Sequence, residues 1–214
     1  QFEVGAAFEH ALGIGDYRHI YGLVYARLRP DLIELLPASV GLDRCVSPGG
    51  VVSWLPPNDT RVRLRIVDIK LTAEPSPSYF AEVTYYAMAL AGWLIDRGLD
   101  DRYVVVPNAA IWPGSHDASC LVRTCREIED QGGTPTYGQM WPAMQEDLEA
   151  VPFEVFVGRV KHFFVGDLPQ ALGIPWQQLP WHVDNRCKGC DYLGYPWHDR
   201  NGQPTAHPLH CMPT

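Results

Sequence analysis

Three short strand-like runs follow one another between residues 40 and 71, and two strong turn signals separate them. The runs cover residues 40–46, 51–55 and 61–71, with Ser-Pro-Gly-Gly and Pro-Pro-Asn-Asp between them. Turns of this composition join neighbouring strands, so the pattern predicts an antiparallel meander. A helical pattern at 78–96 and two more strand-like runs, at 103–107 and 109–112, follow. We therefore expect an α/β domain with a mixed, mostly antiparallel central sheet flanked by helices.

The domain organisation follows from length and composition. At 214 residues, 46% of them apolar, the chain is long enough to bury one sizeable core. Further helical spacing appears at 137–148 and 153–165, but Pro, Trp, Gly and Cys dominate without a period from residue 171 onward. We therefore expect a core at 1–170 and a tail at 171–214 that packs on it. Both ends look cut, which favours a fragment of a longer protein.

Charge and cysteine content exclude several classes of protein. The net charge of −8 argues against a general nucleic-acid coat, although a few side chains or metal ions can still grip phosphates locally. There is neither an apolar run of membrane-spanning length nor a signal-like start, so we expect no membrane partner and a cytoplasmic location. Three of the six cysteines lie near the C-terminus, which favours a cytosolic metal or cluster site over a disulfide scaffold.

Two charges interrupt the most apolar of the three runs, RIVDIKLT at 65–72. Strand alternation places Asp68 and Lys70 on one face and Ile69 on the other. If the runs pair as neighbours, Asp43 in GLDR converges on Asp68. Two close carboxylates repel unless a cation lies between them, so this pattern suits Mg²⁺ or Mn²⁺, with Lys70 placed to orient a metal-bound water. The alternative is an ordinary Asp–Lys pair on a partly exposed edge strand.

Taken together, GLDR, the hairpin, IVDIKLT and YFAEVTYYAMAL resemble the RecB/Cas4-like branch of the PD-(D/E)xK nucleases, which includes AddB-like and Dna2-like members. The resemblance implies a restriction-endonuclease-like core. It also implies that Asp43 and Asp68 bind metal and that Lys70 is the catalytic lysine. The backbone carbonyl of Ile69 is a further ligand in such families.

Two helices extend the resemblance. Tyr86 matches the tyrosine of the family's Gln-x-x-x-Tyr pattern, and Glu82 stands where glutamine is usual. Glu82 either adds a carboxylate near the metal or faces solvent. In VGAAFEHAL, Gly5 leads to Glu9, which matches the acid that completes the family's metal shell, with His10 as the alternative. Two polar residues on an exposed helix face remain the other interpretation.

A C-x-x-C pair, Cys187 and Cys190, marks the tail, and Cys211 follows it. Related nucleases close the domain with a [4Fe–4S] cluster held by three C-terminal cysteines and one N-terminal cysteine, and the resemblance implies the same here. A Cys₃His zinc site is the alternative, because histidines surround Cys211. The fourth ligand is open, and the candidates are Cys45, His198, His207 and His210.

The resemblance thus implies an Mg²⁺- or Mn²⁺-dependent deoxyribonuclease, an exonuclease acting on single-stranded DNA ends. DNA repair or antiviral defence would be its setting, with a helicase or another domain of the same complex as a partner. Two alternatives remain open. One is a non-catalytic nuclease-like module that serves as a DNA-end clamp or scaffold. The other is a zinc-binding interaction domain without nuclease ancestry.

Overall fold

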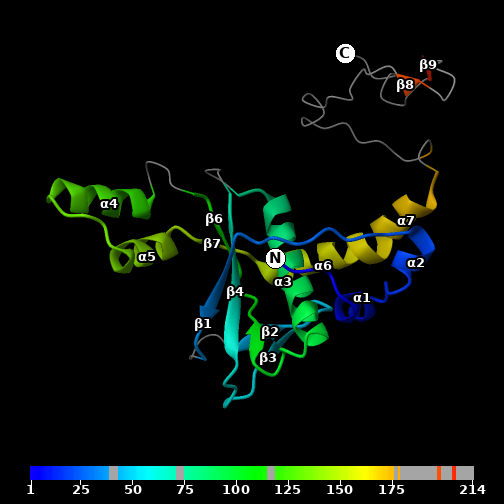
Figure 1. The fold of residues 1–214 in the computed structure, drawn as a ribbon, viewed down its shortest axis with the longest axis horizontal. Helices are drawn as coiled ribbons and strands as arrows, with labels where there is room; N and C mark the ends of the chain where they lie inside the picture. Colours follow the sequence, from blue (N-terminus) through cyan, green and yellow to red (C-terminus); the bar gives the residue numbers. More distant parts are fainter. Residues whose placement is uncertain are drawn as a thin grey trace. The chain divides into compact units, whose positions relative to one another are not determined.

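The computed structural model describes residues 1–38, 43–70, 75–114, 119–175 and 178, together with the backbone of one short strand pair. That pair joins β8 (Trp197–His198) to β9 (Pro204–Thr205). The chain divides into two compact units, Gln1–Pro169 and Gln170–Thr214. The first unit contains the central sheet and the candidate site (Figure 1).

A five-stranded mixed sheet forms the centre of the first unit, within the residues described. Its middle strand, β4 (Val62–Ile69), pairs antiparallel with β1 (Leu32–Leu36) and parallel with both β5 (Tyr103–Val105) and β6 (Ala110–Trp112). β7 (Glu149–Ala150) lies antiparallel to β6. The expected mixed α/β class is confirmed. The pairings divide evenly between parallel and antiparallel, however, so the sheet is not mostly antiparallel.

The expected three-stranded meander is wrong. β2 (Arg44–Val46) and β3 (Val52–Trp54) do form an antiparallel hairpin, whose turn uses Gly50 at a φ of 75°. They make a sheet of their own, however, and β4 pairs with β1, β5 and β6 instead. β4 is mostly buried, and it pairs with the largely buried strands β5 and β6, whereas Trp54 of the hairpin is 76% exposed.

The helix α3 (Pro77–Asp96) packs against the sheet and against α1 (Ala6–Leu12) and α6 (Phe153–His162). This confirms the helix expected at 78–96. Pro77 occupies the first turn, where its missing N–H would lack a partner in any case. Gly92 permits the close approach of α1, because a Cβ at this position would lie 2.9 Å from the backbone nitrogen of Phe8.

The remaining helices bury few of their residues. α2 (Tyr17–Tyr21) follows α1, and α4 (Cys120–Asp130) and α5 (Tyr137–Glu146) form a pair between β6 and β7 (Figure 1). The sequence predicts α5 and α6, but α4 was not expected. α6 continues into a π-helical turn, η1 (Phe163–Asp167), and then into α7 (Leu168–Gly173). Within the described part of the chain, no helix combines the length and apolarity needed to cross a membrane.

Candidate active site

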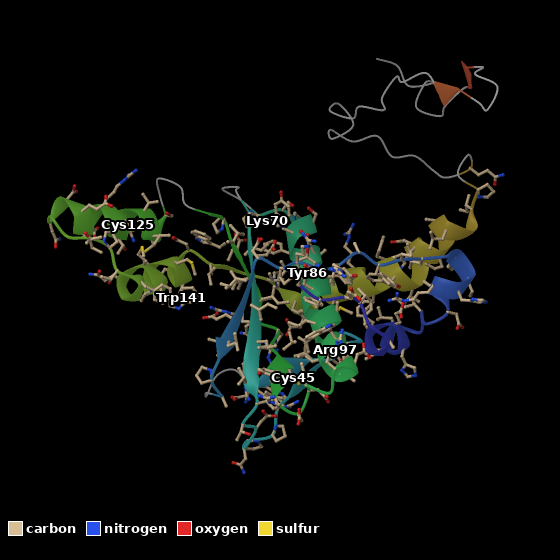
Figure 2. All side chains as sticks on the ribbon, viewed as in Figure 1. Cys45, Lys70, Tyr86, Arg97, Cys125 and Trp141 are labelled. Atoms are coloured by element: carbon tan, nitrogen blue, oxygen red, sulfur yellow. The ribbon has the colours of Figure 1, made fainter. Side chains whose placement is uncertain are left out.

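Lys70 follows β4 directly, and two carboxylates enclose its ammonium group. Its Nζ lies 2.7 Å from Asp68 Oδ2 and 2.9 Å from Glu82 Oε2. The same nitrogen lies 4.9 Å from the ring centroid of Tyr79. Strand alternation brings Asp68 and Lys70 to one face, and helical spacing brings Tyr79 and Glu82 to one side of α3. Two motifs from different elements therefore meet in a single cluster around Lys70, which Figure 2 labels.

Tyr86 extends this cluster by one turn of α3. Its hydroxyl donates to Glu82 Oε1 at 2.8 Å, so Glu82 holds Lys70 with one oxygen and Tyr86 with the other. Burial raises the pKa of Tyr86, and the hydrogen bond to Glu82 raises it further. The phenol therefore remains a donor at neutral pH. Glu82 is therefore held from two sides, while its side chain remains 37% exposed.

Asp31 is a third acid in this cluster, and the sequence did not suggest it. β1 and β4 pair with Leu32 opposite Val67, so Asp31 stands opposite Asp68 one residue further along. Side chains that face each other in this way have Cβ atoms about 5 Å apart. The Oδ2 atom of Asp31 accepts a hydrogen bond from the backbone N–H of Ile69 at 2.8 Å. The register of β1 is thus what adds Asp31 to the site.

The cluster contains three carboxylates and one ammonium group. Burial raises the pKa of Asp68 above its ordinary value; Lys70 opposes this shift, and the charges of Asp31 and Glu82 add to it. Burial alone would lower the pKa of Lys70, but its hydrogen bonds to Asp68 and Glu82 and their charges together raise it. Lys70 is therefore a permanent cation at neutral pH, and Asp68 is a carboxylate with increased affinity for a proton.

Asp43 and Cys45 belong to the β2–β3 hairpin. The carbonyl of Asp43 accepts a hydrogen bond from the N–H of Leu55 at 2.6 Å, and Cys45 Sγ lies 3.3 Å from Ser53 Oγ. Cys45 acts electrostatically on Arg61, which precedes β4, and Figure 2 shows Cys45 well away from Lys70. Because β2 does not pair with β4, strand pairing gives no reason for Asp43 to approach Asp68. The metal-binding role of Asp43 stays a prediction.

Glu9 and His10 lie on α1. Glu9 is buried, and its Oε1 accepts a hydrogen bond from Arg18 Nε at 2.7 Å. Both residues line a hollow of about 470 Å³ that also includes Asp16. In the described ranges, no three His, Cys, Asp or Glu side chains are grouped so that they could hold a metal ion. The Mg²⁺ or Mn²⁺ site that the resemblance implies stays a prediction.

The predicted ligands of the tail lie outside the described residues. This holds for Cys187, Cys190 and Cys211, and for His207 and His210. His198 is described only as part of the β8 backbone. The [4Fe–4S] cluster and its zinc alternative both stay predictions.

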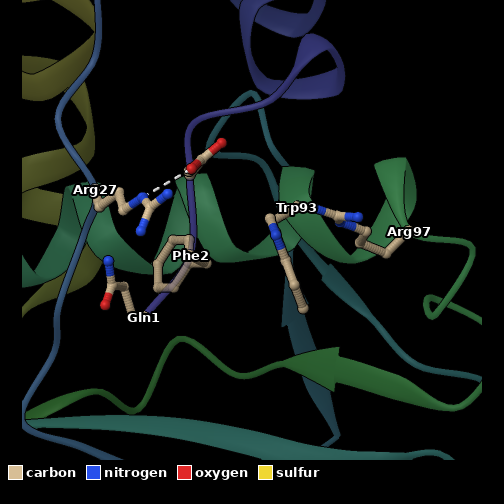
Figure 3. Close-up of a pocket in the computed structure, with 6 residues that line it drawn as sticks. Gln1, Phe2, Arg27, Trp93 and Arg97 are labelled. Atoms are coloured by element: carbon tan, nitrogen blue, oxygen red, sulfur yellow. Dashed lines mark hydrogen bonds and ion pairs between the residues drawn. The ribbon is translucent and has the colours of Figure 1, made fainter.

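A small hollow of about 230 Å³ lies beside Trp93 of α3 (Figure 3). The guanidinium of Arg97 lies 5.6 Å from the ring centroid of Trp93, and Arg27 Nε donates to Glu3 Oε1 at 3.0 Å on the rim. This hollow contains none of the predicted site residues. The Lys70 cluster is therefore the better candidate for chemistry.

Comparison of the chain with protein-family models, with curated proteins and with solved structures finds no match. No relative therefore assigns a role to any residue. Function has to be inferred from the residues of the Lys70 cluster, from their charges and from the distances between them.

Proposed function

We propose that the first unit is a deoxyribonuclease of the RecB/Cas4 type, which hydrolyses phosphodiester bonds at single-stranded DNA ends. One observation carries the proposal: Lys70 Nζ contacts both Asp68 and Glu82, at 2.7 Å and 2.9 Å. This contact unites the acid-x-Lys strand with the helix that carries the Glu-x-x-x-Tyr pattern. In an ordinary surface ion pair both side chains are exposed, whereas the side chain of Asp68 is only 4% exposed.

The charges of the cluster suit distinct roles in this reaction. Lys70 keeps its proton, so its charge can stabilise the negative charge that develops on the phosphate oxygens. Asp68 has a raised pKa and can accept the proton of the attacking water as the water oxygen bonds to phosphorus. The bond from phosphorus to the departing oxygen then breaks, and that oxygen takes a proton from solvent. Glu82 and Tyr86 position Lys70 by contact.

These roles belong to the side chains of this chain alone. Dependence on Mg²⁺ or Mn²⁺, with Asp43, Asp68 and Glu9 as ligands, is the part of the proposal that rests only on the resemblance. The assay therefore includes Mn²⁺ and a matched reaction with EDTA.

Degradation of end-labelled single-stranded DNA tests the proposal. We expect Lys70→Ala to reduce cleavage at least 100-fold, because about 3 kcal/mol of transition-state stabilisation is typical of one charged donor. Lys161→Ala is the matched control, since Lys161 is an exposed lysine on α6, and it should cleave like the wild type. Cleavage that survives Lys70→Ala, or that both variants lose equally, would contradict the assignment.

The rival candidate is a non-catalytic module that holds DNA ends. Two observations favour it: both neighbouring carboxylates already engage the charge of Lys70, and no three-ligand metal group appears among the residues described. This rival predicts DNA binding without cleavage and no Mn²⁺ binding that depends on Asp68. A titration of Mn²⁺ into the wild type and Asp68→Asn, run beside the cleavage assay, separates the two.

A metal centre in the tail forms a second part of the proposal. The spacing of Cys187 and Cys190, with Cys211 beyond them, supports a [4Fe–4S] cluster, and zinc is the alternative. Iron, sulfide and zinc analysis of the purified protein decides between them. Protein that contains neither metal would contradict both.

A further inference from the structure

An apolar groove of about 740 Å³ borders the Lys70 cluster, between α3 on one side and α6 with η1 on the other. Glu82 belongs to both sites, because it contacts Lys70 and also lines the groove. A ligand in this groove would therefore extend directly to the candidate catalytic centre. The proposed function so far gives this groove no role.

Aromatic rings dominate the apolar lining of the groove. Its aromatic residues are Tyr85, Phe156, Phe163 and Phe164. Phe164 is buried and packs on Tyr85 with ring centroids 5.1 Å apart, whereas the side chain of Phe163 remains 48% exposed. Consecutive side chains of a regular α-helix point about 100° apart. Phe163 and Phe164 lie in the π-helical turn η1, where the wider helix reduces this angle, and both side chains line the groove. The groove thus has a buried aromatic floor and an exposed aromatic ring at its edge.

The charges along the groove leave one cation available. Glu82 contacts Lys70, which it shares with Asp68, and Asp167 Oδ1 lies 3.2 Å from His162 Nε2, a contact that is an ion pair only when the histidine is protonated. Arg159 is exposed and forms no ion pair with any residue in the described ranges. An aromatic channel with a free guanidinium at its rim complements a strand of bases joined by phosphates.

We propose that this groove binds the unpaired bases of a single DNA strand, with a phosphate at Arg159 and the strand running on toward Lys70. The inference deepens the proposed function, on which it rests for the direction toward Lys70. Aromatic faces stack on any base, whereas the bases of a duplex already stack on one another. The groove therefore selects unpaired strands. Proline-rich segments of a protein partner also dock in aromatic-lined grooves, and such a segment is the alternative occupant that the test below separates from DNA.

Fluorescence anisotropy in EDTA tests the groove without any cleavage. The probes are a labelled thymidine oligonucleotide, the same length of abasic strand, and a duplex. We expect Phe163→Ala to weaken binding of the thymidine strand about 10-fold and to leave the abasic strand unchanged, because only a base can stack on the ring. Arg159→Ala should weaken both single strands alike, since each carries the same phosphates. Tyr137→Ala is the aromatic control, because Tyr137 lies on α5, is 70% exposed and does not line the groove.

Phe163→Leu guards against a folding defect, because leucine keeps apolar volume but lacks an aromatic face. It should retain the wild-type melting temperature and still lose affinity for the thymidine strand. The proposal is overturned if Phe163→Ala weakens the abasic strand equally, if the thymidine strand binds no better than the duplex, or if affinity is unchanged. An unchanged affinity would leave the groove to an apolar partner protein.

The two proposals fail in different ways. If cleavage depends on Lys70 but Phe163→Ala binds DNA as the wild type does, the groove proposal is rejected and the nuclease proposal stands. Base-dependent binding without any cleavage would keep the groove and favour the end-holding module.

Discussion

β4 carries a charge cluster at each end, and the two clusters have opposite compositions. At the start of the strand, one acid serves two arginines: Asp59 lies 2.6 Å from Arg61 and 2.8 Å from Arg63. The hydrogen bond from Arg61 lowers the pKa of Asp59, against the opposing effect of burial. At the end of the strand, Asp68 and Glu82 share Lys70, and burial with the charges of Asp31 and Glu82 raises the pKa of Asp68.

The difference separates a structural cluster from a candidate functional one. At Asp59 the fold stabilises the ionised carboxylate, so the cluster contributes to folding. At Asp68 the fold makes the ionised form less favourable, which reduces stability at neutral pH. Groups held in such an unfavourable state are typical of active sites, where reactivity takes precedence over stability.

The largest effect on stability is expected at the start of β4. Asp59→Ala removes the carboxylate that lies 2.8 Å from the buried guanidinium of Arg63, 4% exposed, and should lower the free energy of unfolding by about 3 kcal/mol. Because the folded pKa of Asp59 lies below its ordinary value of 3.8, its contribution is present above that pH and is lost as the pH falls through the folded pKa. Denaturant unfolding from pH 7 to pH 2 measures both effects. Asp101→Ala, at an exposed acid nearby, should change little.

A smaller effect, of opposite sign, is expected at the end of β4. Asp68→Asn removes one of the three acids and should raise the free energy of unfolding by about 1 kcal/mol at pH 8. Because the folded pKa of Asp68 is raised, the wild type loses stability as the pH rises from 3.8 through that pKa, so the advantage of Asn grows over the same window. The same unfolding series measures it. A loss of stability at pH 8 would mean that the contact of Asp68 with Lys70 stabilises the fold, as the contacts of Asp59 with Arg61 and Arg63 do.

The smallest effect is expected at an exposed ion pair of similar length. Arg44 lies 2.7 Å from Glu154, but the two side chains are 40% and 56% exposed. Arg44→Ala should therefore change the free energy of unfolding by less than about 0.5 kcal/mol. A change as large as that of Asp59→Ala would show that burial is not what distinguishes the clusters of β4.

Local pattern was enough to predict some of these features. The apolar run of β4, the turn residues of the β2–β3 hairpin and the period of α3 each lie within one short segment. The i, i+2 spacing of Asp68 and Lys70 and the i, i+4 spacing of Glu82 and Tyr86 fix which side chains share a face. That the Asp68–Lys70 pair and the Glu82–Tyr86 pair lie close together in space could be predicted only from the resemblance to the nuclease family.

The features that sequence reasoning missed depend on long-range pairing. The run at Leu32–Leu36 suits a helix as well as a strand, so nothing local indicated that β1 is the neighbour of β4 or that Asp31 stands opposite Asp68. Because β4 pairs with β1 and not with β2, strand pairing does not place Asp43 near Asp68. α4 buries none of its residues, but Ser119 gave a local signal, since its hydroxyl caps the helix by accepting from the N–H of Val122.

The first helix, α1, depends on a residue that is synthesised much later. Its N-cap, Gly5, has no side chain to offer, and the carboxylate of Asp96 accepts from the N–H of Ala7 instead, at 3.0 Å and 89 positions away. A seven-residue helix is marginal on its own. During translation its partner emerges roughly 5 to 20 seconds afterwards, at typical elongation rates. The N-terminal segment can therefore form a stable helix only after the end of α3 has been synthesised. Among the helices of the first unit, α1 should be one of the last whose amide protons become protected from hydrogen exchange.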